Sequence, residues 1–213
     1  MPLEKYQYIV VEGPIGVGKT SLAQRLANHI GADVLLEKPQ DNPFLERFYQ
    51  DPQRHAMSTQ LFFLFQRINE VRDQAQMDMF KTRIVADYLF EKDALFAQLN
   101  LSEDEFKLYQ QIYQSLAPKA PVPDLVIYLQ ASTDTLIERV RRRGREYERS
   151  LNNDYLTRLG NSYGEFFYQY VDAPLMMVNS DNLNFVDNDA DFQLLLERIG
   201  SMRGSREFFS LGA

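Results

Sequence analysis

The sequence contains no cysteine and only two histidines, His29 and His55, among its 213 residues. Without cysteine the chain can form no disulfide framework and can use no thiolate as a nucleophile or metal ligand. Structural zinc sites draw most of their ligands from cysteine and histidine, so a zinc-binding protein is also disfavoured. Because 45% of the residues are hydrophobic, an ordinary apolar core can hold the fold.

The sequence also lacks long apolar runs and an excess of positive charge. No run approaches the roughly 20 residues that a membrane-spanning helix needs. The first residues, Met1-Pro2-Leu3-Glu4-Lys5, lack the apolar stretch of a signal peptide. The net charge of −7 argues against nonspecific binding to a nucleic acid polymer. We therefore expect a soluble, cytoplasmic protein of one domain over 1–213, with small-molecule partners and neither membrane nor nucleic acid.

The most specific motif matches G-x-x-x-x-G-K-[ST] between an apolar run at 8–11 and a helical pattern. Its glycines let backbone N–H groups turn toward phosphate oxygens, and the following helix offers its positive end. Lys19 can reach the β- and γ-phosphates, and the Thr20 hydroxyl can ligate Mg²⁺. The motif predicts a nucleoside-triphosphate site with Mg²⁺ as cofactor. The expected ATP contacts are Gly13, Pro14, Ile15, Gly16, Val17, Gly18, Lys19, Thr20 and Ser21.

Short apolar runs alternate with helical patterns along the chain. The runs at 6–12, 34–36, 83–87, 124–129 and 175–178 are expected strands, and 57–77 is an expected long helix. Such alternation indicates a parallel sheet with right-handed crossovers. The predicted fold class is α/β: a five-stranded parallel sheet flanked by helices, of the P-loop NTPase type that nucleoside and nucleotide kinases use. Residues 204–213 are expected to form a flexible tail.

Two of the predicted strands lead directly into carboxylates, Glu37 and Asp87. Ligands of open α/β sheets bind at the carboxyl ends of the strands, beside the phosphate loop. One carboxylate can accept the proton of an acceptor hydroxyl, and the other can help hold Mg²⁺. For each acid the simpler alternative is a helix cap or a solvated side chain.

Six arginines fall between Arg139 and Arg149. Arg139 and Arg143 are four residues apart and share one helix face, while Gly144 ends the helix and puts Arg145 on a loop. Several guanidinium groups can then converge on one phosphate chain, as in a lid over ATP, here expected at about 139–150. The alternative is a solvated basic end that complements the helix dipole.

Together these motifs resemble the deoxyribonucleoside kinases, and among them the bacterial deoxyadenosine/deoxyguanosine kinase group, from about residue 8 to 199. The resemblance rests on the phosphate loop, on Glu37-Lys38-Pro39, on the Asn42-Pro43…Tyr49 element and on the spacing of Gln60 and Arg67. It also rests on the lid pattern Arg-x₃-Arg-Gly-Arg-x₂-Glu, which ends at Glu148. It implies transfer of the ATP γ-phosphate to the 5′-hydroxyl of a deoxyribonucleoside, with a purine, deoxyadenosine first, favoured. A homodimer is implied as well.

The resemblance also assigns roles to single residues. Glu37 is implied as the general base, and Tyr49 and Glu148 as contacts of the sugar 3′-hydroxyl. Gln60 and Arg67 are implied to read the base edge, with Asp93 pairing to Arg67. The expected catalytic set is Glu37, Asp87, Lys19, Arg139, Arg143 and Arg145, with Thr20 and Asp87 as Mg²⁺ ligands.

One position departs from the family pattern. Where the family usually carries Asp/Glu-Arg-Ser, this sequence has Asp87-Tyr88-Leu89, so the arginine is missing. Lys38, Lys92 and Arg145 are candidate substitutes, and we hypothesise that Lys38 or Lys92 supplies the missing charge.

Two other functions stay open at this point. A nucleoside monophosphate kinase of the thymidylate type needs arginines around the acceptor phosphate, and Arg47, Arg54 and Arg67 are available. Glu37 would, however, repel such an acceptor. A catalytically impaired nucleotide-binding homologue is favoured only by the missing arginine.

Overall fold

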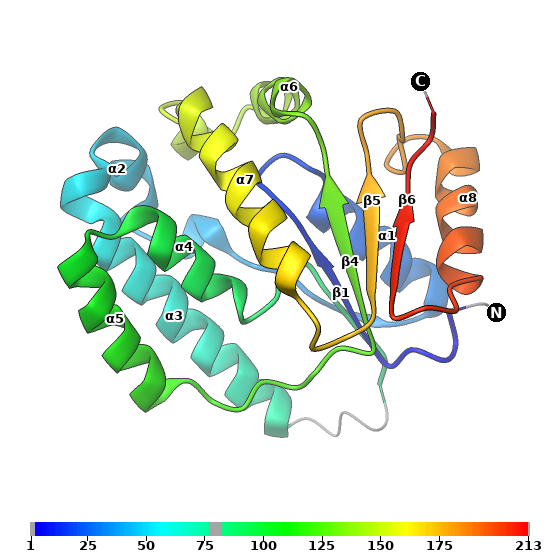
Figure 1. Ribbon diagram of the computed structural model, residues 1–213, viewed down its shortest axis with the longest axis horizontal. Helices are drawn as coiled ribbons and strands as arrows, with labels where there is room; N and C mark the ends of the chain where they lie inside the picture. The colour runs from blue at the N-terminus through cyan, green and yellow to red at the C-terminus, as the bar shows by residue number, and fades with distance from the viewer. Residues whose placement is uncertain (1–2, 77–81, 213) are drawn as a thin grey trace.

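The computed structural model describes residues 3–76 and 82–212. Its strands form one parallel sheet in the order β2-β3-β1-β4-β5-β6 (Figure 1). The strands are β1 (Tyr8–Glu12), β2 (Asp33–Leu35), β3 (Ile84–Ala86), β4 (Leu125–Gln130), β5 (Leu175–Asn179) and β6 (Arg206–Phe209). The predicted α/β class with a parallel sheet is therefore confirmed.

Helices connect the strands as the alternating pattern predicts. They are α1 (Lys19–Ile30), α2 (Leu45–Gln50), α3 (Pro52–Gln76), α4 (Lys92–Asn100), α5 (Glu103–Leu116), α6 (Thr133–Arg143), α7 (Asn153–Gln169) and α8 (Asp189–Gly200). Two short 3₁₀ helices, η1 (Pro39–Asp41) and η2 (Glu146–Glu148), lie in loops. Among the residues that the structure describes, no helix is both long and apolar enough to span a membrane.

The long helix α3 begins five residues before the predicted start at 57. Asp51 precedes it, and the Asp51 carboxylate accepts a hydrogen bond from the Arg54 backbone N–H at 3.4 Å. Pro52 occupies the first helical position, where its missing N–H needs no partner. The predicted last residue, Met77, lies outside the described residues.

Alternate residues of the central strands feed two separate cores. Ile9 and Val11 of β1 pack with the apolar faces of α1 and α8. Val10 lies between them in sequence and packs on the opposite face with α7. Figure 1 shows α7 in front of the sheet and α1 behind it. A third cluster joins α3, α4 and α5, including Leu64 and Ile68 of α3, so these helices form a layer of their own.

Within residues 3–76 and 82–212 the predicted count of five strands is corrected to six, because β6 forms inside the segment that the sequence assigns to a flexible tail. The Leu175 N–H donates to Ser205 O at 2.8 Å, and four residues of β6 pair with β5. Arg206 donates to Tyr170 O at 2.5 Å, and Phe209 packs on the core that α1 and α8 share. The tail composition contains no long apolar run, so only this pairing reveals the strand.

The strand order places three acidic residues at one edge of the sheet. In the register Val10 lies beside Ala86, and Ala86 lies beside Leu35. Glu12 is the last residue of β1, Asp87 follows β3 directly, and Glu37 is two residues beyond β2. Because all these strands are parallel, their carboxyl ends coincide, and the phosphate loop leaves β1 at the same edge.

Neighbouring phenylalanines test whether β6 stabilises the fold. We expect Phe209→Ala to lower the free energy of unfolding by about 2 kcal/mol, because a partly buried ring leaves the core. Phe208, which is 53% exposed, is the matched control, and Phe208→Ala is expected to change it by less than about 0.5 kcal/mol. Urea titration measures both. Equal and negligible effects would contradict the packed strand.

Candidate functional site

The phosphate loop has the backbone that its glycines allow. Gly16 and Gly18 have φ of 90° and 105°, in the left-handed region that side chains disfavour. A Cβ on Gly13 would lie 2.4 Å from Leu129 O, and one on Gly16 would lie 2.9 Å from Leu136 O. The loop therefore packs directly against β4 and the lid helix α6, and Gly18 caps the start of α1.

The Lys19 ammonium lies inside the curve of the loop. It donates to Gly13 O at 2.6 Å and to Pro14 O at 3.2 Å. Burial lowers the pKa of Lys19 to about 8, and the nearby Glu12 carboxylate opposes this shift. Lys19 is thus held where a triphosphate bound by the loop would meet it, as the motif predicts.

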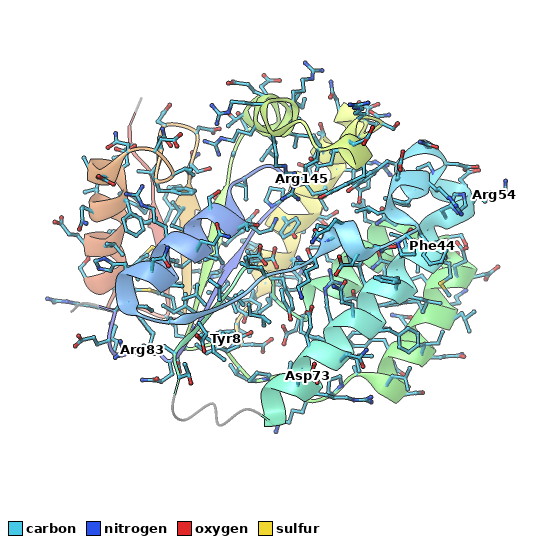
Figure 2. The ribbon with its side chains drawn as sticks, turned by 180° about the vertical axis from the view of Figure 1, so that it is seen from behind. Tyr8, Phe44, Arg54, Asp73, Arg83 and Arg145 are labelled. Carbon is cyan, nitrogen blue, oxygen red and sulfur yellow. The ribbon has the colours of Figure 1, made fainter. Side chains whose placement is uncertain are left out.

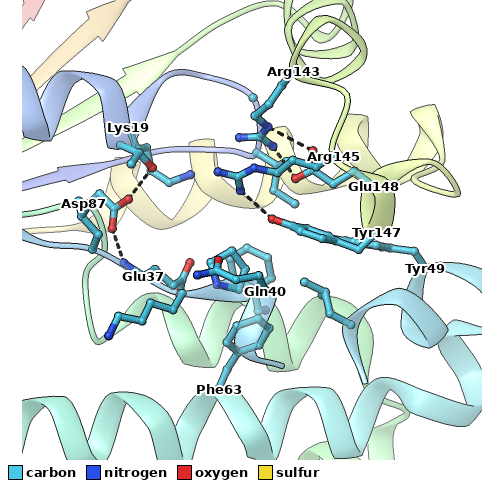
Figure 3. Close-up of a pocket in the computed structure, with 18 of the residues that line it drawn as sticks. Lys19, Glu37, Gln40, Tyr49, Phe63, Asp87, Arg143, Arg145, Tyr147 and Glu148 are labelled. Atoms are coloured by element: carbon cyan, nitrogen blue, oxygen red, sulfur yellow. Dashed lines mark hydrogen bonds and ion pairs between the residues drawn. The ribbon is translucent and has the colours of Figure 1, made fainter. Parts of the chain in front are cut away.

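Asp87 joins the two halves of the site. One of its oxygens accepts from the Thr20 hydroxyl at 2.6 Å, and the other accepts from the Glu37 backbone N–H at 2.7 Å. Figure 3 shows Asp87 between Lys19 and Glu37 with both contacts drawn. The carboxylate therefore ties the phosphate loop to the loop that carries the candidate base.

The Glu37 carboxylate lies between two cations. The Lys92 ammonium is 3.1 Å from one oxygen, and the Arg67 guanidinium pairs with the other. Burial alone would raise the pKa of Glu37, but Lys92 first and then Arg67 lower it to about 2. Glu37 is therefore ionised at neutral pH and is held in a fixed orientation, with 19% of its side chain exposed.

A second buried carboxylate anchors Arg67 at the far end of the site. Asp93 is fully buried, pairs with Arg67 and accepts a hydrogen bond from the Tyr109 hydroxyl. The Gln60 amide donates to Asp93 O at 3.2 Å. The structure thus brings together the Gln60, Arg67 and Asp93 set that the resemblance implies, with Phe63 beside Arg67.

These groups surround one cavity of about 670 Å³. The phosphate-loop residues that line it are Ile15, Gly16, Gly18, Lys19, Thr20 and Ser21; the predicted contacts Gly13, Pro14 and Val17 do not line it. The other predicted site residues along its wall are Glu37, Tyr49, Gln60, Arg67, Asp87, Arg143, Arg145 and Glu148. Asp93 lies behind Arg67 and does not line it. A volume of this size accommodates a small-molecule ligand.

The lid arginines differ in what they contact. Arg143 forms two hydrogen bonds to the Glu148 carboxylate, at 2.5 and 3.2 Å, and Arg145 donates to the Tyr147 hydroxyl at 2.7 Å. Figure 3 shows these pairs across the cavity from Phe63. Seen from behind, Arg145 lies below α6, on the side where the strands end (Figure 2).

Arg139 is placed differently from the prediction. It does not line the cavity. Its guanidinium donates to Ser180 O at 2.7 Å, to the Ser180 hydroxyl at 3.0 Å and to Val17 O at 3.3 Å. Arg139 therefore connects α6 to the phosphate loop and to the end of β5.

Sequence reasoning missed Glu12. Its side chain is fully buried and accepts from the Gly13 N–H at 2.9 Å, the Leu89 N–H at 2.7 Å and the Tyr163 hydroxyl at 2.9 Å. The signal was present, because Glu12 ends an apolar strand just as Glu37 and Asp87 follow theirs. Tyr155 and Asn100 also line the cavity, and no spacing rule distinguishes them from core residues.

Tyr88, where the family arginine is missing, is 2% exposed and does not line the cavity. The Lys92 ammonium lies 5.8 Å from the centre of its ring. Of the candidate substitutes, Lys38 and Arg145 line the cavity, whereas Lys92 lies behind Glu37.

Comparison with known proteins shows the family of the chain. Residues 9–202 match the family model for deoxynucleoside kinase. The chain belongs to the deoxynucleoside kinase family. It is 32% identical to the deoxyguanosine kinase of Bacillus subtilis over 90% of this chain and 95% of that one. It is 33% identical to the deoxyadenosine kinase of Lactobacillus acidophilus over 85% and 89%.

A solved structure shares the fold of this family member. The deoxyadenosine kinase from M. mycoides with bound dATP superposes with a TM-score of 0.80 at 25% identity, covering 92% of this chain and all of that one. The phosphate-loop kinase fold predicted from the sequence is confirmed. The roles of individual residues stay predictions.

The pKa of Lys19 predicts how nucleotide binding depends on pH. Below pH 8 the ammonium is charged and attracts phosphate oxygens; as pH rises through about 8, the free protein loses this charge. We expect the Kd of a non-hydrolysable ATP analogue to rise about fivefold between pH 8 and pH 9.

Calorimetry from pH 7 to pH 9.5 measures this dependence. Lys19→Arg is the control, because its guanidinium stays charged and should give a Kd that is flat over this range. A wild-type Kd that is constant to pH 9.5 would contradict the lowered pKa.

Proposed function

We propose that the protein transfers the γ-phosphoryl group of ATP to the 5′-hydroxyl of a purine deoxyribonucleoside, with deoxyadenosine preferred. One observation carries the proposal: the phosphate loop and the clamped carboxylate of Glu37 face the same cavity. A donor phosphate on the loop and an acceptor hydroxyl at Glu37 would then lie in the same cavity, with no protein segment between them.

On the donor side the chain supplies positive charge and hydrogen bonds. Backbone N–H groups of the phosphate loop and the Lys19 ammonium hold the phosphate chain. Arg143 and Arg145 also line the cavity and stabilise the charge on the moving phosphoryl group. Arg139 then acts by positioning α6 over the phosphate loop.

The residues present fit a Mg²⁺ site. Thr20 and Asp87 place a hydroxyl and a carboxylate oxygen 2.6 Å apart beside the loop, and hard oxygen donors are what Mg²⁺ prefers. Among residues 3–76 and 82–212 no three acidic or histidine side chains gather as a metal cage. Mg²⁺ commonly binds through one or two protein oxygens plus the phosphates. When bound, it neutralises phosphate charge.

On the acceptor side Glu37 orients the 5′-hydroxyl and accepts its proton as the oxygen–phosphorus bond forms. Phosphoryl transfer proceeds through a loose transition state, so positioning matters more than base strength. A carboxylate with a lowered pKa suits this role, because it stays ionised. Tyr49 and Glu148, which line the cavity near each other, are the proposed contacts of the sugar 3′-hydroxyl.

Gln60 supports the preference for adenine. Its amide nitrogen donates one hydrogen to Asp93 O, which leaves the carbonyl oxygen and the second N–H for a ligand. An acceptor beside a donor complements the exocyclic amine and ring nitrogen of adenine. The aromatic rings of Phe63 and Phe96, also in the cavity wall, offer apolar faces for the base.

The geometry disfavours a nucleoside monophosphate kinase. Arg67 is already paired with Glu37 and Asp93. Arg47 and Arg54 do not line the cavity, and Figure 2 shows Arg54 at the outer edge of the molecule. An acceptor phosphate at Glu37 would meet a carboxylate, and the adjacent Arg67 is already paired.

A homodimer and a cytoplasmic location complete the proposal. Phe65 of α3 and Leu108 of α5 are 48% and 51% exposed, and such large apolar side chains suit burial against a second copy. ATP as the donor fits work in the cytoplasm.

The direct test is Mg²⁺-dependent phosphorylation of the four common deoxyribonucleosides and their monophosphates. We expect the highest kcat/KM with deoxyadenosine and at least a 100-fold loss of kcat in Glu37→Gln, because the 5′-hydroxyl loses its proton acceptor. The ATP-analogue Kd of the variant should be unchanged, which shows that it is folded. Turnover of monophosphates alone would overturn the proposal.

A further inference from the structure

A chain of buried charges runs between the phosphate loop and the acceptor end of the site. Glu12 is fully buried and Lys92 is 2% exposed. The Lys92 ammonium lies 3.6 Å from a Glu12 oxygen and 3.1 Å from a Glu37 oxygen. One cation therefore bridges a carboxylate of β1 and the candidate base.

Hydrogen bonds from outside β1 fix the Glu12 carboxylate. Its oxygens accept from the Gly13 N–H in the phosphate loop, the Leu89 N–H beyond β3 and the Tyr163 hydroxyl of α7. Three separate segments thus set the position of this carboxylate, and Lys92 transmits that position to Glu37. Lys92 and Glu12 are absent from the cavity wall, so neither is placed to touch a substrate.

Burying the Lys92–Glu12 ion pair costs desolvation free energy. Removing an ammonium and a carboxylate from water carries a penalty of several kcal/mol for each ion, and a well-packed apolar pair often stabilises a fold at least as well. Fold stability alone therefore does not explain well why a buried ion pair occupies these two positions. Precise orientation of Glu37 gives a stronger reason, because a misplacement of about 1 Å at a reacting group lowers the rate by about 100-fold.

We infer that Lys92 and Glu12 are positioning residues for the transfer step: Glu12 anchors Lys92, and Lys92 holds Glu37 at the acceptor hydroxyl beside the phosphate loop. The inference deepens the proposed function and rests on it. The inference also defines how Lys92 could make up for the arginine that is missing at Tyr88. Lys92 compensates from behind the base, through Glu37, whereas Lys38 is one of the cations that line the cavity.

A double-mutant cycle between Lys92 and Glu37 tests the inference. We expect Lys92→Met to lower kcat by about 100-fold with the KM for ATP within about twofold of wild type. In the Glu37→Gln background the same substitution should lower kcat by less than about threefold, because its effect passes through Glu37. Lys92→Arg keeps the charge and should recover at least tenfold of the lost kcat.

Two further variants control for folding and for the substitution itself. Glu12→Gln with Lys92→Met removes one charge of each sign, so the buried site keeps its net charge, and this variant should show the same loss of kcat. The Lys107 side chain is 60% exposed and does not line the cavity, so Lys107→Met should retain the wild-type kcat.

The outcomes separate failure of the positioning role from failure of the proposed kinase function. If Lys92→Met lowers kcat equally in the wild-type and Glu37→Gln backgrounds, Lys92 acts independently of Glu37 and the inference is wrong. Unchanged kcat in both Lys92→Met and the Glu12→Gln/Lys92→Met variant overturns it as well. If wild type phosphorylates no nucleoside, the proposed function fails and takes the inference with it.

Discussion

The alternation of buried charges from Glu12 through Lys92, Glu37 and Arg67 to Asp93 is the constraint on which the site depends. Each cation touches two carboxylates, so neither can move without breaking a pair in a poorly solvated interior. Burial would otherwise neutralise Glu37; the flanking cations keep it ionised. The same contacts fix the acceptor end of the cavity relative to the phosphate loop.

The sheet makes this arrangement possible. Parallel strands end at one edge, and the order β2-β3-β1 brings Glu37, Asp87 and Glu12 together from positions far apart in sequence. Helices α3 and α4 then supply the cations, Arg67 and Lys92. The geometry of the candidate site thus follows from topology first and from loop conformation second.

The sequence predicts the parts of the site that depend on local backbone. A glycine-rich turn between a strand and a helix lets backbone N–H groups face a phosphate, and apolar runs that lead into Glu37 and Asp87 point to the ligand edge. It does not predict that Arg139 turns to Ser180, because that contact joins segments 41 residues apart. Nor does it predict β6, whose pairing with β5 supplies the order that its composition lacks. Glu12 was recognisable by the strand-end rule, but its partners are set by tertiary packing.

The ionisation of Glu37 is the most direct measure of the central claim. Carboxyl chemical shifts of ¹³C-labelled glutamate, assigned with Glu37→Gln, report its titration in the folded protein. Clamping by Lys92 and Arg67 predicts a midpoint far below the usual 4.5, near 2, so that the signal stays that of a carboxylate throughout the range in which the protein is folded. A midpoint at or above 4.5 would show that burial outweighs the two cations, and the account of a charge-clamped base would be wrong.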